Sequence, residues 1–274
     1  MLNNPKLVAK IEAEEPAQRL AVLIDADNAQ AAIIEGLLFE IASLGEATVK
    51  RIYGDFTSPA SAQWKKVLNK FAIKPVQQFA YTSGKNATDS TLIIDAMDLL
   101  YTRRFHGFCL VSSDSDFTGL AVRIREEGLV VFGFGEKKTP ESFRNACNKF
   151  IFTEVLRSVE QVPLTHTTPN IDHTASSTSK SSSSTSSSPI GDVLPYALFQ
   201  QALEQAGDEN GWTTLANFGS QLTKLRSDFD ARNFGYKKLS DLVRAQTELF
   251  TLQERETANS DTKVLYIRSK KSIA

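Results

Sequence analysis

Between residues 19 and 155, short apolar runs alternate with longer segments in which apolar residues recur at helical spacing. The first run is "RLAVLID" (19–25), and the segment that follows it (29–44) carries its apolar side chains on one stripe. Further strands are predicted at "ATVKRIYGD", "KPVQQFAY", "GFCLVSSD", "LVVFGFG" and "KFIFT", and further helices after Ser58 and Pro59 and over 89–101, 117–127 and 140–147. Repeated βα units predict an α/β fold in which helices cover both faces of a parallel sheet.

Two of the predicted strands end in pairs of carboxylates. In "LAVLIDADNA" the apolar run is followed by Asp25 and Asp27, and in "LVSSDSDF" it is followed by Asp114 and Asp116. Right-handed crossovers would place the first three strands in succession and return the fourth beside the first. Ligands bind at the carboxyl ends of the strands where the winding reverses. The sequence therefore predicts that the two acidic ends are neighbours at a binding site.

A third acidic position, Asp89 in "SGKNATDS", opens the helix after the third strand. Two carboxylates ~4 Å apart repel by about 4 kcal/mol at an effective dielectric constant of about 20, so a cluster requires protons or a cation. Hard oxygen ligands favour Mg²⁺ or Mn²⁺. His106 is the one histidine of this region, which leaves little material for a Ser-His-Asp mechanism. Metal-assisted attack of water on a phosphoryl group fits these residues.

The segments "IDADN", "GKNATDSTLIIDA" and "VSSDSDF", in this order, resemble the NYN domain, a PIN-like nuclease with a Rossmann-like parallel sheet. The resemblance implies a metal-dependent ribonuclease that leaves 5′-phosphate and 3′-hydroxyl ends. Asn28 would orient the first carboxylate or the phosphate, and Lys85 is a candidate phosphate ligand. The implied catalytic residues are Asp25, Asn28, Asp89, Asp114 and Asp116, and the four aspartates are the implied metal ligands.

Several of these residues also have a purely structural interpretation. Asp25 can accept backbone hydrogen bonds at a turn, and Asn28 and Asp116 can cap the helices that follow them. Asp89 can be a first-turn aspartate that the helix dipole stabilises. Asp95, farther along that helix, is expected either to support the site or to face solvent.

Composition divides the chain in two. Ser or Thr occupies 16 of the 24 positions from Thr165 to Ser188, and such a segment cannot bury enough surface to offset its ordering entropy. We expect an N-terminal extension (1–18), a catalytic domain (19–160), a disordered linker (161–189) with a span of roughly 30 Å, and a second domain (190–270).

The second domain contains the string "GWTTLANFGSQLTKLRSDFDARNFGYKKLSDLV". Three helical segments followed by two β-rich ones predict a small winged-helix unit, with Trp212 and other large apolar residues in its core. The string resembles the OST-HTH, or LOTUS, domain, which implies RNA binding or, in some relatives, docking of a protein partner. The candidate phosphate ligands are Lys224, Arg226, Arg232, Lys237, Lys238 and Arg244.

Charge and hydropathy add few constraints. A net charge of −1 neither favours nor excludes a polyanionic partner. The N-terminal residues lack the apolar core of a signal peptide, and no apolar run reaches the ~18 residues of a membrane span. Cys109 and Cys147 lie among apolar residues without a CxxC spacing. We expect a soluble, cytoplasmic protein with reduced cysteines.

The favoured hypothesis is a ribonuclease that hydrolyses RNA phosphodiester bonds with Mg²⁺ or Mn²⁺, while the second domain raises the local RNA concentration. Two alternatives stay open. The first is a non-catalytic RNA-binding adaptor that retains the acidic pocket. The second is a haloacid-dehalogenase-type phosphatase with Asp25 as its nucleophile, although Ala29 stands where that family usually has Thr or Val.

Overall fold

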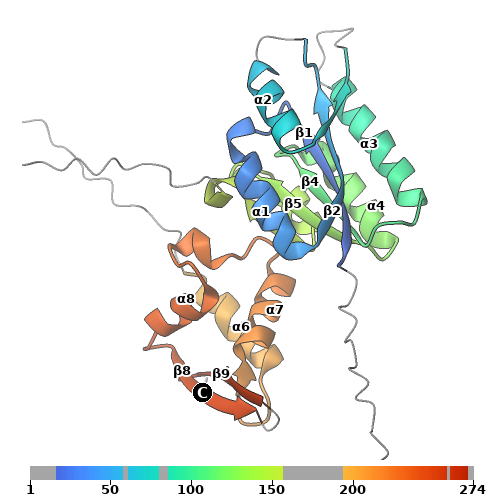
Figure 1. The fold of residues 1–274 in the computed structure, drawn as a ribbon. Helices are drawn as coiled ribbons and strands as arrows, with labels where there is room; N and C mark the ends of the chain where they lie inside the picture. Colours follow the sequence, from blue (N-terminus) through green and yellow to red (C-terminus); the bar gives the residue numbers. More distant parts are fainter. Residues whose placement is uncertain (1–16, 58–60, 80–85, 157–193, 258–259, 271–274) are drawn as a thin grey trace, which may run out of the picture.

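The computed structural model describes residues 17–57, 61–79, 86–156, 194–257 and 260–270 (Figure 1). The expected linker (161–189), Lys85 and the helix start at Ser58 and Pro59 lie outside the described residues, as does almost all of the expected N-terminal extension. Among the described residues, no helix is long and apolar enough to cross a membrane.

The first domain is built on a sheet of six parallel strands in the order β3-β2-β1-β4-β5-β6. This order confirms the prediction that the fourth strand lies beside the first. The strands are β1 (Arg19–Asp25), β2 (Glu46–Gly54), β3 (Lys74–Gln77), β4 (Gly107–Val111), β5 (Val130–Gly135) and β6 (Lys149–Phe152).

Helices cover both faces of this sheet, as predicted (Figure 1). The alternation of side chains along β1 explains the two layers, since Val22 and Ile24 point into one apolar cluster and Ala21 and Leu23 into the other. One cluster contains residues of α1 (Ile34–Leu44) and α2 (Ala62–Lys70), and the other contains residues of α3 (Asn86–Tyr101), α4 (Thr118–Glu126) and α5 (Glu141–Ala146). Among the residues that the structure describes, the domain also contains the short 3₁₀ turns η1 (Ala31–Ile33), η3 (Ser115–Phe117) and η4 (Thr153–Leu156).

The second domain has the predicted winged-helix arrangement of three helices and a small antiparallel sheet in the order β7-β9-β8. The ring of Phe199 lies at the centre of its core, with ring centroids 5.8 Å from those of Phe229 and Phe250. The elements are α6 (Tyr196–Ala206), β7 (Thr213–Thr214), α7 (Leu215–Leu225), η5 (Ala231–Phe234), α8 (Leu239–Ala245), β8 (Phe250–Thr257) and β9 (Ser260–Ser269).

Trp212 departs from the expected core position. Its ring is only half buried and is covered by the guanidinium groups of Arg255 and Arg268, each 4.8 Å from the ring centroid. Because an indole face attracts cations, this ring stabilises a charged surface of the sheet instead of the apolar interior.

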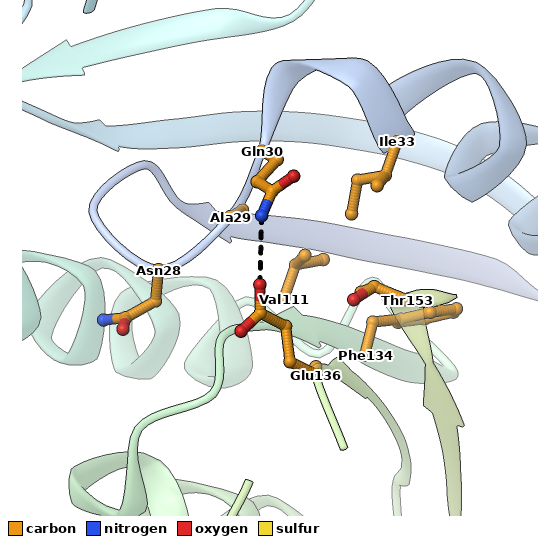
Figure 2. Close-up of a pocket in the computed structure, with 9 residues that line it drawn as sticks. Asn28, Ala29, Gln30, Ile33, Val111, Phe134, Glu136 and Thr153 are labelled. Atoms are coloured by element: carbon orange, nitrogen blue, oxygen red, sulfur yellow. Dashed lines mark hydrogen bonds between the residues drawn. The ribbon is translucent and has the colours of Figure 1, made fainter. Parts of the chain in front are cut away.

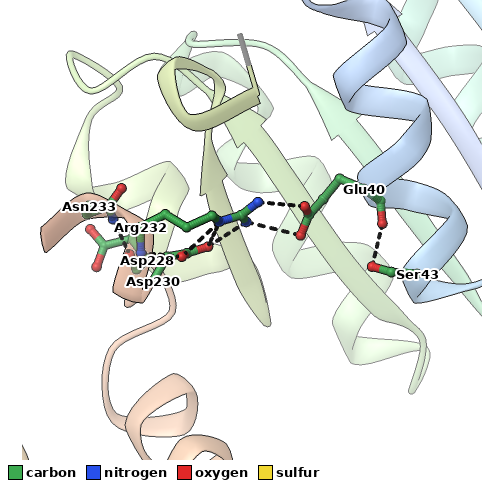
Figure 3. Close-up of polar contacts among 6 residues, drawn as sticks. All are labelled: Glu40, Ser43, Asp228, Asp230, Arg232 and Asn233. Atoms are coloured by element: carbon green, nitrogen blue, oxygen red, sulfur yellow. Dashed lines mark hydrogen bonds and ion pairs between the residues drawn. The ribbon is translucent and has the colours of Figure 1, made fainter. Parts of the chain in front are cut away.

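The two domains contact each other through η5 and the segment before it. The guanidinium of Arg232 donates two hydrogen bonds to the carboxylate of Glu40 on α1, at 2.8 and 3.1 Å (Figure 3). The backbone N–H of Phe150 on β6 donates to the carbonyl of Ser227 at 2.8 Å, which pairs part of the exposed edge of the sheet.

A close backbone approach between α1 and η4 leaves no room for a side chain at Gly36. A Cβ at Gly36 would lie 2.1 Å from the carbonyl oxygen of Leu156, whereas a Cβ at Gly119 on α4 would meet no atom within 4 Å. We expect Gly36→Ala to lower the free energy of unfolding by about 2 kcal/mol, because the backbone must shift. Gly119→Ala, the matched control, should raise it by up to about 1 kcal/mol through helix propensity. Urea titration of both variants checks this, and equal stability of the two would contradict the packing described.

Candidate active site

Asp25 ends the central strand, and its side chain is fully buried. Three donors hold its carboxylate: Asn28 Nδ2 and Ser112 Oγ donate to Oδ2 at 2.8 Å each, and the Asp27 N–H donates to Oδ1 at 3.0 Å. Burial raises the pKa of Asp25 above its ordinary value, while these hydrogen bonds act in the opposite direction. Asn28 therefore contacts Asp25 and does not cap the helical segment that follows, because the N-cap residue of η1 is Gln30.

Three further aspartates lie together at the same edge of the sheet. Carboxylate oxygens of Asp89, Asp114 and Asp116 are within 4.8 Å of one another. Asp89 comes from the first turn of α3, while Asp114 and Asp116 come from the segment after β4. The Asp116 N–H donates to Asp114 Oδ1 at 3.0 Å, so Asp114 is the residue that caps η3.

The charges of this cluster act on one another. The pKa of Asp89 is raised to about 6, first by burial and then by the negative charges of Asp25, Asp114 and Asp116. A carboxyl whose pKa is raised by burial and by neighbouring carboxylates is typical of a site that takes a cation or a proton.

The donor set fits a hard divalent ion. Asp89, Asp114 and Asp116 each offer a carboxylate oxygen, and these oxygens are close enough to share one ion. Among the described residues, no histidine or cysteine belongs to the group, which fits Mg²⁺ or Mn²⁺ better than Zn²⁺. Asp25 is close enough to raise the pKa of Asp89 but is not part of the group of three.

The loops that follow β1, β4 and β5 are tied together behind the cluster. Gln30 Nε2 donates to Glu136 Oε1 at 3.1 Å, and the Glu136 N–H donates to Ser113 Oγ at 2.9 Å. Figure 2 shows the Asn28 side chain pointing away from this contact. The adjoining cavity of about 10 Å³ has room for at most one water molecule. These residues therefore tie the three loops together, and the cavity between them is too small for a substrate.

Ser112 is a site residue that the motifs alone did not single out. It lies inside the quoted string "LVSSDSDF", and its position at the end of β4, beside the end of β1, is the signal that identifies it. Asp95, by contrast, is held by Arg51 and Tyr53 of β2, and its negative charge contributes to the raised pKa of Tyr53. Asp95 therefore fastens α3 to the sheet.

The predicted cations of the second domain lie in two environments. Lys224, Lys237 and Lys238 are exposed, whereas the half-exposed Arg226 pairs with Asp228 at 2.8 Å. Arg232 is bonded to both Glu40 and Asp230, and these hydrogen bonds raise its pKa. Arg244 pairs with Glu254 at 3.1 Å. The structure thus brings the acidic residues together in one cluster, while the cations belong to a separate domain.

Comparisons with known proteins agree with this architecture. A family profile for the NYN domain matches residues 19–156, and one for the OST-HTH/LOTUS domain matches residues 194–260. The chain therefore belongs to the NYN domain family, a group of PIN-like nucleases, and carries an OST-HTH/LOTUS domain after its NYN domain.

Three solved structures are similar to parts of the chain. An uncharacterized protein from Nitrosomonas europaea is 42% identical, with 36% of this chain and 96% of that chain covered and a TM-score of 0.30. A protein of unknown function from Vibrio parahaemolyticus is 19% identical over 51% of this chain and 95% of its own, with a TM-score of 0.43. A fragment of a protein from Chromobacterium violaceum is 28% identical over 31% of this chain and 89% of its own, with a TM-score of 0.24. Comparison with curated proteins gave no match.

The raised pKa of Asp89 predicts a pH-dependent stability of the metal-free protein. The folded state holds the proton up to about pH 6, whereas the unfolded chain releases it near pH 4, so the free energy of unfolding should fall as pH rises through this window. At pH 7, Asp89→Asn should be more stable than the wild type by about 1 kcal/mol, after allowance for solvent screening. Asp98→Asn, at an exposed position of the same helix, should change little.

Urea titrations in EDTA at pH 4, 5, 6 and 7 measure the difference. It should shrink toward pH 4, where the wild-type carboxyl is protonated. A less stable Asp89→Asn protein at pH 7 would show that the cluster does not repel.

Proposed function

We propose that the protein is a metal-dependent ribonuclease that hydrolyses RNA phosphodiester bonds. The observation that carries the proposal is the convergence of Asp89, Asp114 and Asp116 at the carboxyl edge of the sheet of an NYN domain. The buried Asp25 lies close enough to raise the pKa of Asp89. An OST-HTH/LOTUS domain in the same chain supports RNA as the substrate class.

In this proposal, Asp89, Asp114 and Asp116 hold Mg²⁺ or Mn²⁺, and Asp25 adds a ligand from the end of β1. The ion, when bound, supplies a Lewis acid for the phosphoryl oxygen and a water of lowered pKa. Asn28 and Ser112 fix the orientation of the Asp25 carboxylate through their hydrogen bonds. Lys85, which precedes α3 in the sequence, is proposed to contact the phosphate.

The second domain is proposed to bring RNA to this site. The exposed Lys224, Lys237 and Lys238 offer mobile cations for phosphates, which need no base readout, and Arg226, which pairs with Asp228, is a further candidate ligand. Arg232 is held by Glu40, so its proposed contact with RNA requires that pair to open. Because both domains belong to one chain, RNA held by the second is at high local concentration near the first.

Loss of one proposed metal ligand should abolish cleavage without loss of folding. Asp114→Asn keeps the size of the side chain but removes its charge, and we expect a drop of about a hundredfold or more in the rate of RNA cleavage. End-labelled RNA and DNA, incubated with Mg²⁺, Mn²⁺ or EDTA, provide the assay. The products of the wild type should carry 5′-phosphate ends.

Asp98→Asn is the matched control and should cleave like the wild type, since Asp98 is exposed on α3 and is not part of the cluster. Full metal-dependent cleavage by Asp114→Asn would disprove the assignment. RNA binding without cleavage by the wild type at any metal tested would identify a non-catalytic adaptor instead.

The cations of the second domain should be visible in the salt dependence of RNA binding. Lys237→Ala and Lys238→Ala should each weaken binding and reduce the slope of log K against log salt by about 0.7, the value for one phosphate contact on a single strand. Lys70→Ala, which removes an ammonium paired with Glu35 at 3.0 Å in the first domain, should leave the slope unchanged. Equal slopes for all these proteins would remove the two lysines from the RNA interface.

A further inference from the structure

A cavity of about 280 Å³ lies where the two domains meet. This volume is near the lower end of the range for ligand pockets, ~300–1,000 Å³. Its walls combine cations, aromatic rings and an amide, and the side chains that matter here are Lys137, Arg144 and Phe152 of the first domain and Arg226, Asn233 and Phe234 of the second.

The cavity has more positive than negative charge. Arg144 and Arg226 both form ion pairs with the buried carboxylate of Asp228, and Arg226 Nε is 2.8 Å from its Oδ1. One carboxylate thus faces two guanidinium groups, and Lys137 lines the same space. The excess of positive charge favours an anionic ligand, for which arginine is the preferred partner when the anion is a phosphate.

Two buried polar atoms in the wall have no hydrogen-bond partner among the described residues. They are Arg144 Nε, a donor, and Asn233 Oδ1, an acceptor. Buried polar groups almost always find a partner, because leaving one unpaired costs about 1–3 kcal/mol. Both atoms are closed off from solvent, so they lie behind the surface of the cavity, and a ligand meets them only if the Arg144 and Asn233 side chains move.

The aromatic side chains give the ligand a surface on which to stack. Phe234 is partly exposed, and its ring is tilted by 31° to that of Phe229 at a centroid distance of 5.8 Å. The Arg144 guanidinium lies 5.8 Å from the ring centroid of Phe152. A planar base stacks on such rings, and the neighbouring cations bind the phosphate that accompanies it.

The topology places this cavity at the edge of the sheet that carries the acidic cluster. Lys137 follows β5 and Phe152 ends β6, so both lie at the carboxyl ends of the strands, as Asp114 does after β4. β4 and β6 are separated by one strand, a distance of about 10 Å. Part of the lining of the cavity therefore lies at the same end of the sheet as the acidic cluster.

We propose that this interdomain cavity is a nucleotide-binding site in which Arg144, Arg226 and Lys137 hold the phosphate and Phe234 stacks on the base. The nucleotide is either a free mononucleotide or one unit of an RNA strand. The part of the proposal that concerns RNA rests on the proposed function, because that function supplies the RNA strand.

Phe234→Leu tests the site in the full-length protein, because it removes the ring and keeps both charge and apolar bulk. Binding of a labelled eight-residue oligouridine is measured by fluorescence anisotropy, and binding of uridine 5′-monophosphate by calorimetry, both in EDTA. We expect the variant to bind the RNA about tenfold more weakly, the loss of one stacked base. Phe39→Leu, at a phenylalanine that is 81% exposed on α1, is the matched control and should bind like the wild type.

A second pair of variants covers the case in which Phe234→Leu fails to fold. Arg226→Ala should also weaken binding about tenfold, the loss of one charge-assisted contact. Arg123→Ala removes an arginine that is likewise ion-paired, with Glu127, but lies outside the cavity, and it should have no effect. Glu40→Gln should weaken binding of the mononucleotide as well, since it loosens the contact between the two domains that form the cavity without touching the ligand.

Loss of RNA binding together with loss of mononucleotide binding would show a site that accepts both sources, and loss of RNA binding alone would show a site for a strand. Wild-type affinity for both ligands in folded Phe234→Leu and Arg226→Ala would overturn the proposal. Binding is measured in EDTA, where no cleavage occurs, so the binding result does not depend on nuclease activity. If the wild type cleaves no RNA but the Phe234→Leu and Arg226→Ala variants lose binding, the proposed function is refuted and the nucleotide site is supported.

Discussion

The architecture of the acidic site depends on the burial of the Asp25 carboxylate at the end of β1. A buried charge is tolerated only when hydrogen-bond donors surround it. Asn28 and the Asp27 N–H come from the turn after β1, and Ser112 comes from the end of β4. These contacts fix the turn and hold the ends of the two central strands together, so the loop that carries Asp114 has a defined starting point.

The acidic cluster follows from this constraint, and it opposes stability. Asp89 is brought by α3 toward Asp114 and Asp116, and burial together with the charges of the neighbouring carboxylates raises its pKa to about 6. An apolar or neutral residue at any of these positions would relieve the repulsion. Side chains that repel one another at a strand end, in a domain whose interior is otherwise packed with apolar residues, are typical of a site retained for function at the expense of stability.

The sequence predicted the order of the first four strands because the handedness of βα crossovers leaves few alternatives, and that order was enough to expect Asp25 and Asp114 at neighbouring strand ends. The role of Asn28 was not predictable, because capping and contact with Asp25 use the same residue type at the same spacing. Trp212 was expected in the core, yet its ring lies under two arginines of β8 and β9 that no local pattern connects with it. Contacts between residues far apart in the chain depend on the complete fold.

The contact between the domains shows how far this limit reaches. Arg232 and Glu40 are 192 positions apart, and the sequence around either residue gives no indication that the two are in contact. A partly exposed ion pair contributes only about 0–1 kcal/mol, so the pair between Arg232 and Glu40 would not hold two separate proteins together. Within one chain, the effective concentration of one domain near the other is on the order of millimolar, and weak contacts then suffice for docking. A ligand that binds only the docked arrangement would stabilise it further, because binding to one state shifts the population toward that state. The segment that contains Asp228 and Arg232 therefore couples the position of the second domain to whatever occupies the cavity it helps to form.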